Sequence, residues 1–187
     1  MQHDKAPMVI GTASSGRYSQ REAVLTFCSH DDMPPPLLFD ISAYDLDQLQ
    51  FGVDAIERVN PHRHQMRMLD GVIYMDEDRV IAFHDVRDDE FWVEGHIPGR
   101  PVMPGVLLIE TAAQTASFYM LSRLESAKFM GFVGASDIKF RGQVVPGKRL
   151  LVLAEMVDVR SRRCVCKAQC LIDETMVFEG TITGMPM

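Results

Sequence analysis

Neither a charged-then-apolar leader nor an apolar run of membrane-spanning length occurs in this chain of 187 residues. The most apolar run begins at Val106, and polar residues such as Glu110 and Gln114 interrupt it. A membrane span needs about 20 predominantly apolar residues, so this run belongs in a protein core. We therefore expect a cytoplasmic protein with no membrane partner.

An excess of basic residues is also missing. The 19 Lys and Arg residues are outnumbered by 26 Asp and Glu residues, which gives a formal net charge of -7. This balance argues against a nucleic-acid partner and against bulk binding to anionic membranes. Basic residues nevertheless gather in two parts of the chain, where they form either a solvated face or a docking patch for an acidic partner. They are Arg58, His62, Arg63, His64 and Arg67, then Lys139, Arg141, Lys148, Arg149, Arg160, Arg162 and Arg163.

Cysteine is scarce, with four in the whole chain. Cys164, Cys166 and Cys170 fall on even steps, so on a strand they share one face with Ala168. A row of small buried apolar residues explains this spacing. Because no convincing further ligand lies nearby in sequence, we predict no metal site.

The order of the predicted elements favours one α+β domain. A short helix over 54–59 ends at Asn60-Pro61, and a hairpin joins 71–75 to 79–86 through the turn 76–78. After the long apolar helix, β-rich runs are predicted at 128–145, 149–159, 164–172 and 176–183.

This order predicts an antiparallel meander after the helix and a curved sheet that wraps around it. One helix does not cover a large sheet alone, so we expect dimerisation through sheet edges. Residues 1–32 are polar and without a sustained period, which is typical of a poorly ordered tail.

The chain is organised around the stretch 91–124, which opens with a loop from Gly95 to Gly105. Three prolines and three glycines in that loop exclude regular structure and fix its shape. Pro104 suits the first turn of the helix that follows. A histidine, His96, lies in the rigid loop, and a carboxylate, Glu110, lies one turn or so into the apolar helix.

These residues suit proton chemistry next to a carbonyl group. His96 is a candidate general base, and an apolar setting would equip Glu110 to act as an acid. Gln114 lies four residues further on the same helical face, where it can orient the Glu110 carboxyl group. Free N–H groups at Gly105 and Val106 would stabilise a developing oxyanion. Together they fit α-proton abstraction with loss of a β-hydroxyl, which requires no metal or organic cofactor.

Other interpretations of the same residues stay open at this point. His96 on its own is more often a structural hydrogen-bonding residue, and a lone glutamate in a helix usually faces solvent. A zinc site built from His96, Glu110 and either His62 or His64 is a less favoured alternative.

The stretch resembles the β-hydroxyacyl-acyl-carrier-protein dehydratases of fatty-acid synthesis, in their glutamate-using FabZ-type branch. The residues that carry the resemblance are Gly95-His96-Ile97-Pro98, then Pro101-Val102-Met103-Pro104-Gly105, then Glu110-Thr111-Ala112-Ala113-Gln114. The segments 61–70 and 138–147 also resemble that family, so the likeness extends from about residue 55 to the C-terminus.

The resemblance implies a hot-dog fold in which His96 takes the α-proton and Glu110 protonates the departing 3-hydroxyl. The N–H of Gly105 would hold the thioester oxygen. The two catalytic residues of each site would come from different subunits of a homodimer, which is often a unit of a hexamer, a trimer of dimers. An apolar tunnel at the dimer interface would hold the acyl chain, lined by Ile97, Met103, Phe132 and Phe140. The thiol carrier would be acyl carrier protein or coenzyme A, and an acidic carrier suits the basic clusters.

The chain departs from the family pattern in several places. Ile97 replaces the usual phenylalanine, Glu94 stands where a neutral amide is common, and Gly131 occupies the place of an aromatic gate found in some members. Residues 1–52 have no counterpart, so we predict an N-terminal extension, partly disordered, before a dehydratase domain at 53–187. A non-catalytic acyl-thioester-binding protein and a thioesterase of the same fold are the alternative functions.

Overall fold

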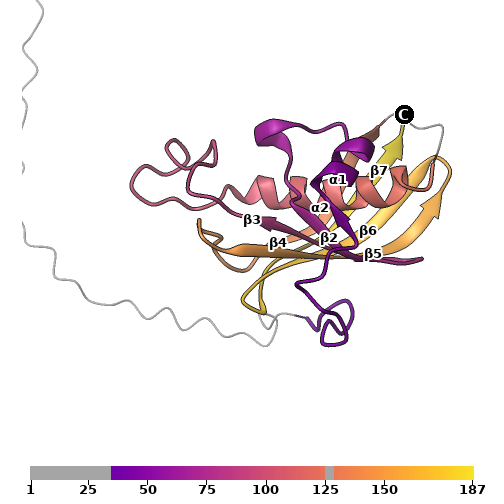
Figure 1. Cartoon of the computed structure of the whole chain (residues 1–187), viewed down its shortest axis with the longest axis horizontal. Coiled ribbons are helices and arrows are strands. Elements are labelled where there is room, and N and C mark those ends of the chain that lie inside the picture. The colour runs from indigo at the N-terminus through magenta and orange to yellow at the C-terminus, as the bar shows by residue number, and fades with distance from the viewer. Residues whose placement is uncertain (1–34, 125–128) are drawn as a thin grey trace, which may run out of the picture. The chain divides into compact units, whose positions relative to one another are not determined.

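The computed structural model describes residues 35–124 and 129–187, which form an α+β domain (Figure 1). The helices are α1 (Val53–Val59), the 3-10 turn η1 (His64–Met66) and α2 (Gly105–Leu121). The strands are β1 (Phe51–Gly52), β2 (Gly71–Met75), β3 (Arg79–Asp85), β4 (Met130–Phe140), β5 (Arg149–Arg160), β6 (Arg163–Ile172) and β7 (Thr175–Pro186). They form one antiparallel sheet in the order β1-β2-β3-β5-β6-β7-β4.

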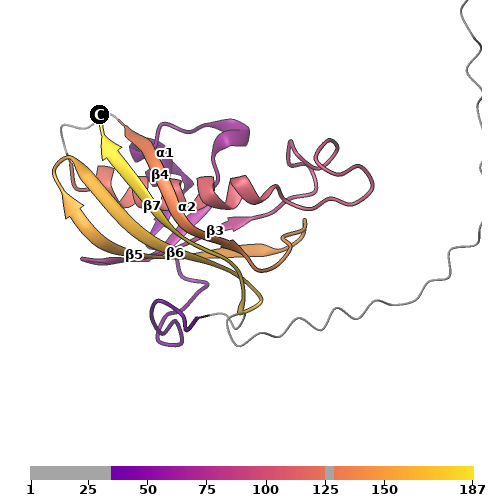
Figure 2. The same cartoon turned by 180° about the vertical axis from the view of Figure 1, so that it is seen from behind.

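The long helix α2 lies across one face of this sheet, and the strands curve around it (Figure 2). No glycine or proline interrupts α2 after Gly105, and most side chains from Leu108 to Met120 are buried. A helix buried on nearly all sides lacks a clean polar face, and polar residues such as Thr111, Gln114 and Ser117 are indeed buried in it with the apolar ones. The prediction of one central helix wrapped by a curved antiparallel sheet is therefore confirmed.

Strand pairing confirms the hairpin of β2 and β3, but the predicted meander is wrong in one respect. β5, β6 and β7 follow one another in the sheet, whereas β4 pairs with β7 at the edge rather than with β5. Sequence order does not fix such a pairing, because β4 reaches its place through the long helix and not through a tight turn.

The fourth strand is also shorter than the predicted run of 128–145. It ends at Phe140, after which the N–H groups of Arg141 and Gly142 both donate to the carbonyl of Val177. The chain then leaves the sheet and contacts the loop before α2. There the carbonyl of Val144 accepts a hydrogen bond from the N–H of Met103 at 2.8 Å. Residue 128 lies outside the described residues.

The main core fills the space between α2 and the sheet. Cys164, Cys166 and Cys170 are all buried there together with Ala168, as the even spacing predicts. Burial raises the pKa of the Cys164 thiol to about 11, with a smaller contribution from Asp158. These thiols therefore pack in the core as small apolar side chains at neutral pH.

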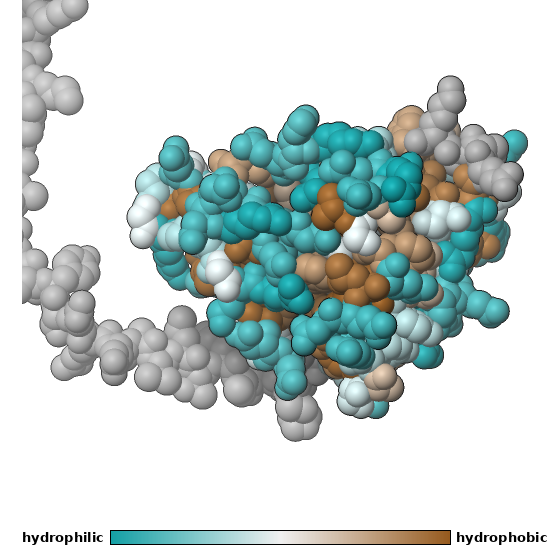
Figure 3. Space-filling model, viewed as in Figure 1, coloured by the Kyte–Doolittle hydropathy of each residue, from teal (hydrophilic) through white to brown (hydrophobic). Residues whose placement is uncertain are grey.

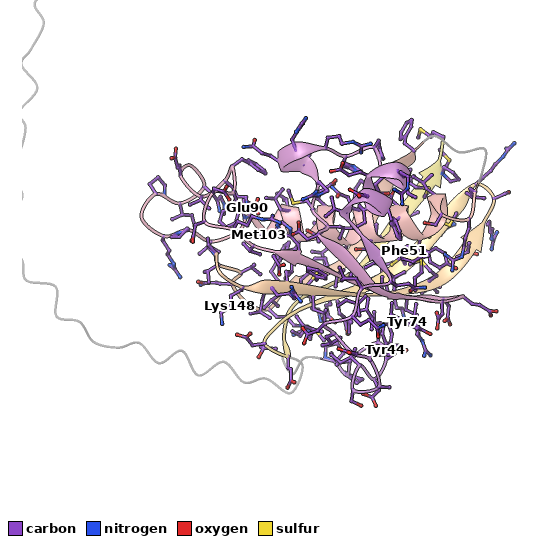
Figure 4. The ribbon with its side chains drawn as sticks, in the orientation of Figure 1. Tyr44, Phe51, Tyr74, Glu90, Met103 and Lys148 are labelled. Carbon is purple, nitrogen blue, oxygen red and sulfur yellow. The ribbon has the colours of Figure 1, made fainter. Side chains whose placement is uncertain are left out.

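A second, smaller core lies on the face of the sheet opposite α2, between the sheet and residues 35–50 (Figure 1). Phe39 is buried there against a set of strand residues, which are Ile73, Ile81, Phe83, Leu151, Leu153, Leu171 and Met176. The side chain of Gln169 fixes this segment, since it donates to the carbonyl of Pro36 and accepts from the N–H of Leu38. Figure 4 shows Tyr44 of the segment next to Tyr74 of β2, with ring centroids 4.5 Å apart.

The predicted domain boundary at residue 52 stays a prediction, although the described part of the extension packs on the sheet and includes β1. The predicted tail up to Asp32 and the fourth cysteine, Cys28, lie outside the described residues. Within the described part of the chain, no helix has the length and apolar character needed to cross a membrane.

Candidate active site

Glu110 projects from the first half of α2 with its side chain 29% exposed. One turn later, the buried amide of Gln114 donates through Nε2 to Oε1 of Glu110 at 2.7 Å. The orienting hydrogen bond expected from the i, i+4 spacing is thus present. It fixes one carboxyl oxygen and leaves Oε2 without a recorded partner in the described part of the chain.

Gln114 does more than orient this acid. Its Nε2 also donates to the carbonyl of Met66 at 2.7 Å, and its Oε1 accepts from the N–H of Met68 at 2.9 Å. The amide therefore joins the segment after α1 to the central helix, which the sequence did not reveal. Its hydrogen-bonding capacity is used almost completely at a site that is 1% exposed.

A small cavity of about 60 Å³ adjoins Glu110. His62, Glu110 and Gln114 lie on its wall, and the side chain of His62 approaches Glu110 with Nε2 3.4 Å from Oε1. The remaining wall is mostly small or apolar and comes from α2, β4, β6 and β7, with Ala113, Ala116, Ser117, Met130, Gly131, Phe132, Cys164, Ile182, Thr183 and Gly184. A carboxyl group is thereby placed at the side of a largely apolar space, the arrangement expected for an acid acting on a lipid-like substrate.

His96 is held in the loop that projects beyond the N-terminus of α2 (Figure 1). Its main-chain N–H donates to the carbonyl of Trp92 at 2.9 Å, and its ring Nδ1 lies 2.8 Å from the carbonyl of Val102. A carbonyl oxygen is an acceptor, so Nδ1 carries a proton in this contact, and in the neutral ring Nε2 then keeps the lone pair. The exposed imidazole is therefore prepared to act as a base through Nε2.

Gly105 is the first residue of α2, and its N–H has no acceptor recorded among the described residues. The ring of Phe140 lies so close that a Cβ atom at position 105 would be 2.9 Å from it. Glycine is therefore required for this approach, and the helix N-terminus supplies a free donor with a partial positive charge.

The structure brings some of the predicted site residues together and keeps others apart. Glu110, Gln114 and Phe132 line one cavity, whereas Ile97 lies in the exposed loop, Met103 is buried in the main core, and Phe140 covers Gly105. Within the described part of one chain, no recorded contact joins His96 to Glu110. The zinc alternative would need these two side chains side by side, and no group of three potential metal ligands occurs among the described residues.

A buried charged cluster supports the base of the His96 loop, and the sequence reading missed it. His84 of β3 lies between two carboxylates, with Nδ1 2.9 Å from Asp70 and Nε2 3.2 Å from Glu90. Arg87 contacts both acids, at 2.5 Å from Asp70 and 3.6 Å from Glu90. Glu90 precedes the His96 loop in sequence, and its carbonyl accepts from the N–H of Val93 at 3.0 Å (Glu90 is labelled in Figure 4).

Asp70 remains ionised in this buried place. Burial by itself raises the pKa of Asp70, but hydrogen bonds from His84, Arg87 and the N–H of Asp85 outweigh it and hold the pKa well below its usual range. Ion pairs in the cluster connect strand β3 to the segment that leads into the loop. Removal of one charge would leave its buried partner without a counter-charge.

Many of the basic residues that the sequence singled out are ion-paired inside the chain. Recorded pairs include Arg67 with Glu57 and Asp70, Arg141 with Glu179, Lys148 with Asp173, Arg149 with Asp85, and Arg160 with Asp158. Hydrophilic side chains cover much of the face in Figure 3, with hydrophobic groups between them. The solvated-face interpretation is sufficient for Lys148, Arg149 and Arg160, whereas Arg67 and Arg141 are largely buried in their ion pairs.

Comparison with known proteins decides the family. A family model described as a FabA-like domain matches residues 60–181. The 3-hydroxyacyl-[acyl-carrier-protein] dehydratase FabZ of Streptococcus gordonii is 38% identical over 132 residues, which cover 70% of this chain and 94% of that protein. The chain belongs to the FabZ-type dehydratase family.

Other FabZ-type relatives match to a similar extent, including that of Streptococcus pneumoniae at 37% identity over 132 residues, with 70% and 94% of the two chains covered. Among solved structures, the dehydratase heterocomplex ApeI:P from Xenorhabdus doucetiae matches with a TM-score of 0.63 at 15% identity, covering 71% of this chain and 90% of that one. Cj0977 from Campylobacter jejuni matches with a TM-score of 0.55 at 15% identity, covering 74% and 94%. The predicted hot-dog fold is thereby confirmed.

Proposed function

We propose that this FabZ-type protein dehydrates (3R)-3-hydroxyacyl thioesters to trans-2-enoyl thioesters in fatty-acid biosynthesis. The observation that carries the proposal is the carboxyl group of Glu110 at the side of an apolar cavity, with one oxygen fixed by Gln114. Family membership supports the same reaction, since the curated relatives are named for it. The protein's cytoplasmic location stays a prediction from the sequence.

The reaction needs a base, an acid and an oxyanion donor. Nε2 of His96 takes the proton from the carbon next to the thioester, because Nδ1 is engaged by the carbonyl of Val102. The N–H of Gly105 holds the thioester oxygen as negative charge develops on it. Glu110 then gives its proton from Oε2 to the departing 3-hydroxyl, which leaves as water while the double bond forms.

Two copies of the chain are proposed to share each site. The absence of a recorded contact between His96 and Glu110 within the described part of one chain supports a site completed by the loop of a second subunit. Strand β4 lies at the sheet edge and exposes Phe132 and Val133, which supports this edge as the meeting surface. Assembly of three such dimers into a hexamer is the corresponding proposal for the larger unit.

The acyl chain is proposed to enter the cavity beside Glu110. Phe132, which is 55% exposed in the single chain, would be covered when a second subunit closes the tunnel. Ile97 and Phe140 are exposed and are proposed to contact the substrate from the loop and from the end of β4, whereas Met103 is buried in the main core. Neither Ile97 nor Phe140 lines the cavity beside Glu110 in the described part of one chain, which supports a lining shared between subunits.

Acyl carrier protein is proposed as the thiol carrier, with coenzyme A as the alternative. Lys139 of β4 is exposed and has no ion pair recorded among the described residues. An exposed cation on this edge strand of the sheet is suited to docking an acidic carrier.

An absorbance assay for the enoyl thioester tests the reaction. Purified protein is incubated with 3-hydroxybutyryl thioesters of acyl carrier protein and of coenzyme A, in parallel with His96→Ala and Glu110→Gln. We expect enoyl product from the wild type and at least about a hundredfold less from each variant. Free thiol in place of enoyl product would indicate a thioesterase, and binding without turnover would indicate an acyl-thioester-binding protein.

A further inference from the structure

The side chain of His62 lies against the proposed acid, and no part of the reaction above uses it. Nε2 of His62 lies 3.4 Å from Oε1 of Glu110, the same oxygen that accepts from Gln114. This contact is longer than an ordinary N–H···O hydrogen bond of about 2.9 Å. Hydrogen bonds between catalytic groups are often long before substrate binds and tighten in the complex.

The backbone at His62 is fixed from two sides without help from its ring. The buried side chain of Asn60 donates to the carbonyl of Gln114 at 2.9 Å and accepts from the hydroxyl of Ser117 at 2.8 Å. The guanidinium group of Arg63 donates to the carbonyls of Asn60 and His62 at 2.7 and 2.8 Å. A rigid segment therefore places the His62 ring next to Glu110. Replacement of the ring should leave the backbone of that segment in place.

The other ring nitrogen argues against a purely structural role. Nδ1 of His62 is buried and has no hydrogen-bond partner among the described residues. A buried polar atom without a partner lowers stability, so the ring is not placed there for the hydrogen bonds that it makes to the fold. The ring also lines the cavity beside Glu110, with its side chain 27% exposed.

We propose that His62 is a positioning residue that decides which oxygen of Glu110 carries the acidic proton. The proposal rests on the dehydration assigned above to Glu110. With its proton on Nε2, the ring gives Oε1 a second N–H donor beside that of Gln114. An oxygen that accepts two N–H groups serves as the carbonyl oxygen of the neutral acid, and the proton then resides on Oε2.

The consequence is a carboxyl group that is always presented in one orientation. Oε2 has no partner recorded in the described part of the chain, so it is free to reach the departing hydroxyl group. Without His62, a single donor at Oε1 would allow the carboxyl group to turn, and the proton would be aimed at the substrate for less of the time. The loss should therefore fall on kcat and leave KM nearly unchanged.

Two substitutions with the same chemistry and different reach test this role. In His62→Gln the side-chain amide places an N–H near the position of the ring Nε2, whereas in His62→Asn the shorter amide stops near Nδ1. We expect His62→Gln to keep kcat within about threefold of the wild type and His62→Asn to lose about tenfold or more, with KM within about twofold for both. Gln65→Ala, which removes an exposed side chain from the same segment, serves as the control with unchanged kcat.

Wild-type kcat in His62→Asn would overturn the proposal, and so would an equal loss in the Gln and Asn variants, which would indicate packing alone. Each variant is assayed beside the wild type and Glu110→Gln. A wild type without enoyl product, or an active Glu110→Gln, would instead contradict the proposed function. Failure of the positioning role and failure of the reaction therefore give different results.

Discussion

Gln114 joins Glu110 to the segment that follows α1, because its one side-chain amide bonds Oε1 of Glu110, the carbonyl of Met66 and the N–H of Met68. The same group therefore orients the proposed acid and holds the fold around it. Stability and catalysis should respond together when it is replaced.

Replacement of Gln114 by leucine should lower both quantities. The buried N–H of Met68 and the carbonyl of Met66 lose their partner, so we expect the free energy of unfolding to fall by about 2 to 4 kcal/mol. Denaturant unfolding measures this. Thr115→Val is the control on the same buried helix, since it removes one hydroxyl that donates to the carbonyl of Thr111, and should cost about 1 kcal/mol or less. Equal stability of the two variants would contradict the role of Gln114.

The charged cluster beneath the His96 loop predicts a defined dependence of stability on pH. The pKa of Asp70 is lowered in the folded state, so the stability that this carboxylate contributes is present above its unfolded pKa of about 3.9 and is lost as pH falls below it. Urea unfolding from pH 7 down to pH 2 should show this loss begin near pH 4 in the wild type and continue to the lowest pH.

Asp70→Asn removes the titrating group and provides the comparison for that experiment. The variant should be about 3 kcal/mol less stable near pH 7, because His84 and Arg87 lose a charged partner. The difference between the two proteins should shrink as pH falls from about 4 to 2. Parallel pH curves for the two proteins would show that Asp70 does not control acid stability.

The close approach of Phe140 to Gly105 is testable by a double-mutant cycle. Gly105→Ala places a Cβ atom 2.9 Å from the ring, and we expect a loss of about 1 to 2 kcal/mol of stability. In a Phe140→Ala background the same change should be neutral or stabilising, since alanine favours the helix over glycine. An identical cost in both backgrounds would exclude the ring as the cause.

The proposed carrier interaction predicts a substrate-dependent effect at Lys139. Lys139→Glu should raise KM for the carrier-linked substrate by about tenfold and leave KM for the coenzyme A thioester almost unchanged. The first effect should weaken as salt is added, because exposed charges are screened. Equal changes for both thioesters would indicate damage to the site rather than to carrier docking.

Much of the architecture could be predicted from the sequence because its signals are local. Pro104 and Gly105 mark the start of α2, the apolar run marks its burial, and turn residues delimit β2 and β3. The i, i+4 spacing likewise predicted the contact of Gln114 with Glu110. Each of these features depends on residues that are near neighbours in the chain.

The features that the sequence did not reveal depend on distant parts of the chain. The pairing of β4 with β7, the packing of Phe39 on the far face of the sheet, and the bond from Asn60 to α2 each join segments separated by many residues. Their only local signals are ordinary apolar or polar residues. The charged cluster around His84 was hidden for the same reason, since its members come from β3 and the segments on either side.

The central claim is that each site combines His96 of one subunit with Glu110 of another, and subunit mixing tests it most directly. His96→Ala and Glu110→Gln chains, each inactive alone, are unfolded together in equal amounts, refolded and assayed for enoyl thioester. Half of the dimers should be mixed, and each of these should hold one intact site, so recovery of about a quarter of wild-type activity is expected. No recovery from correctly folded mixed dimers would contradict a shared site.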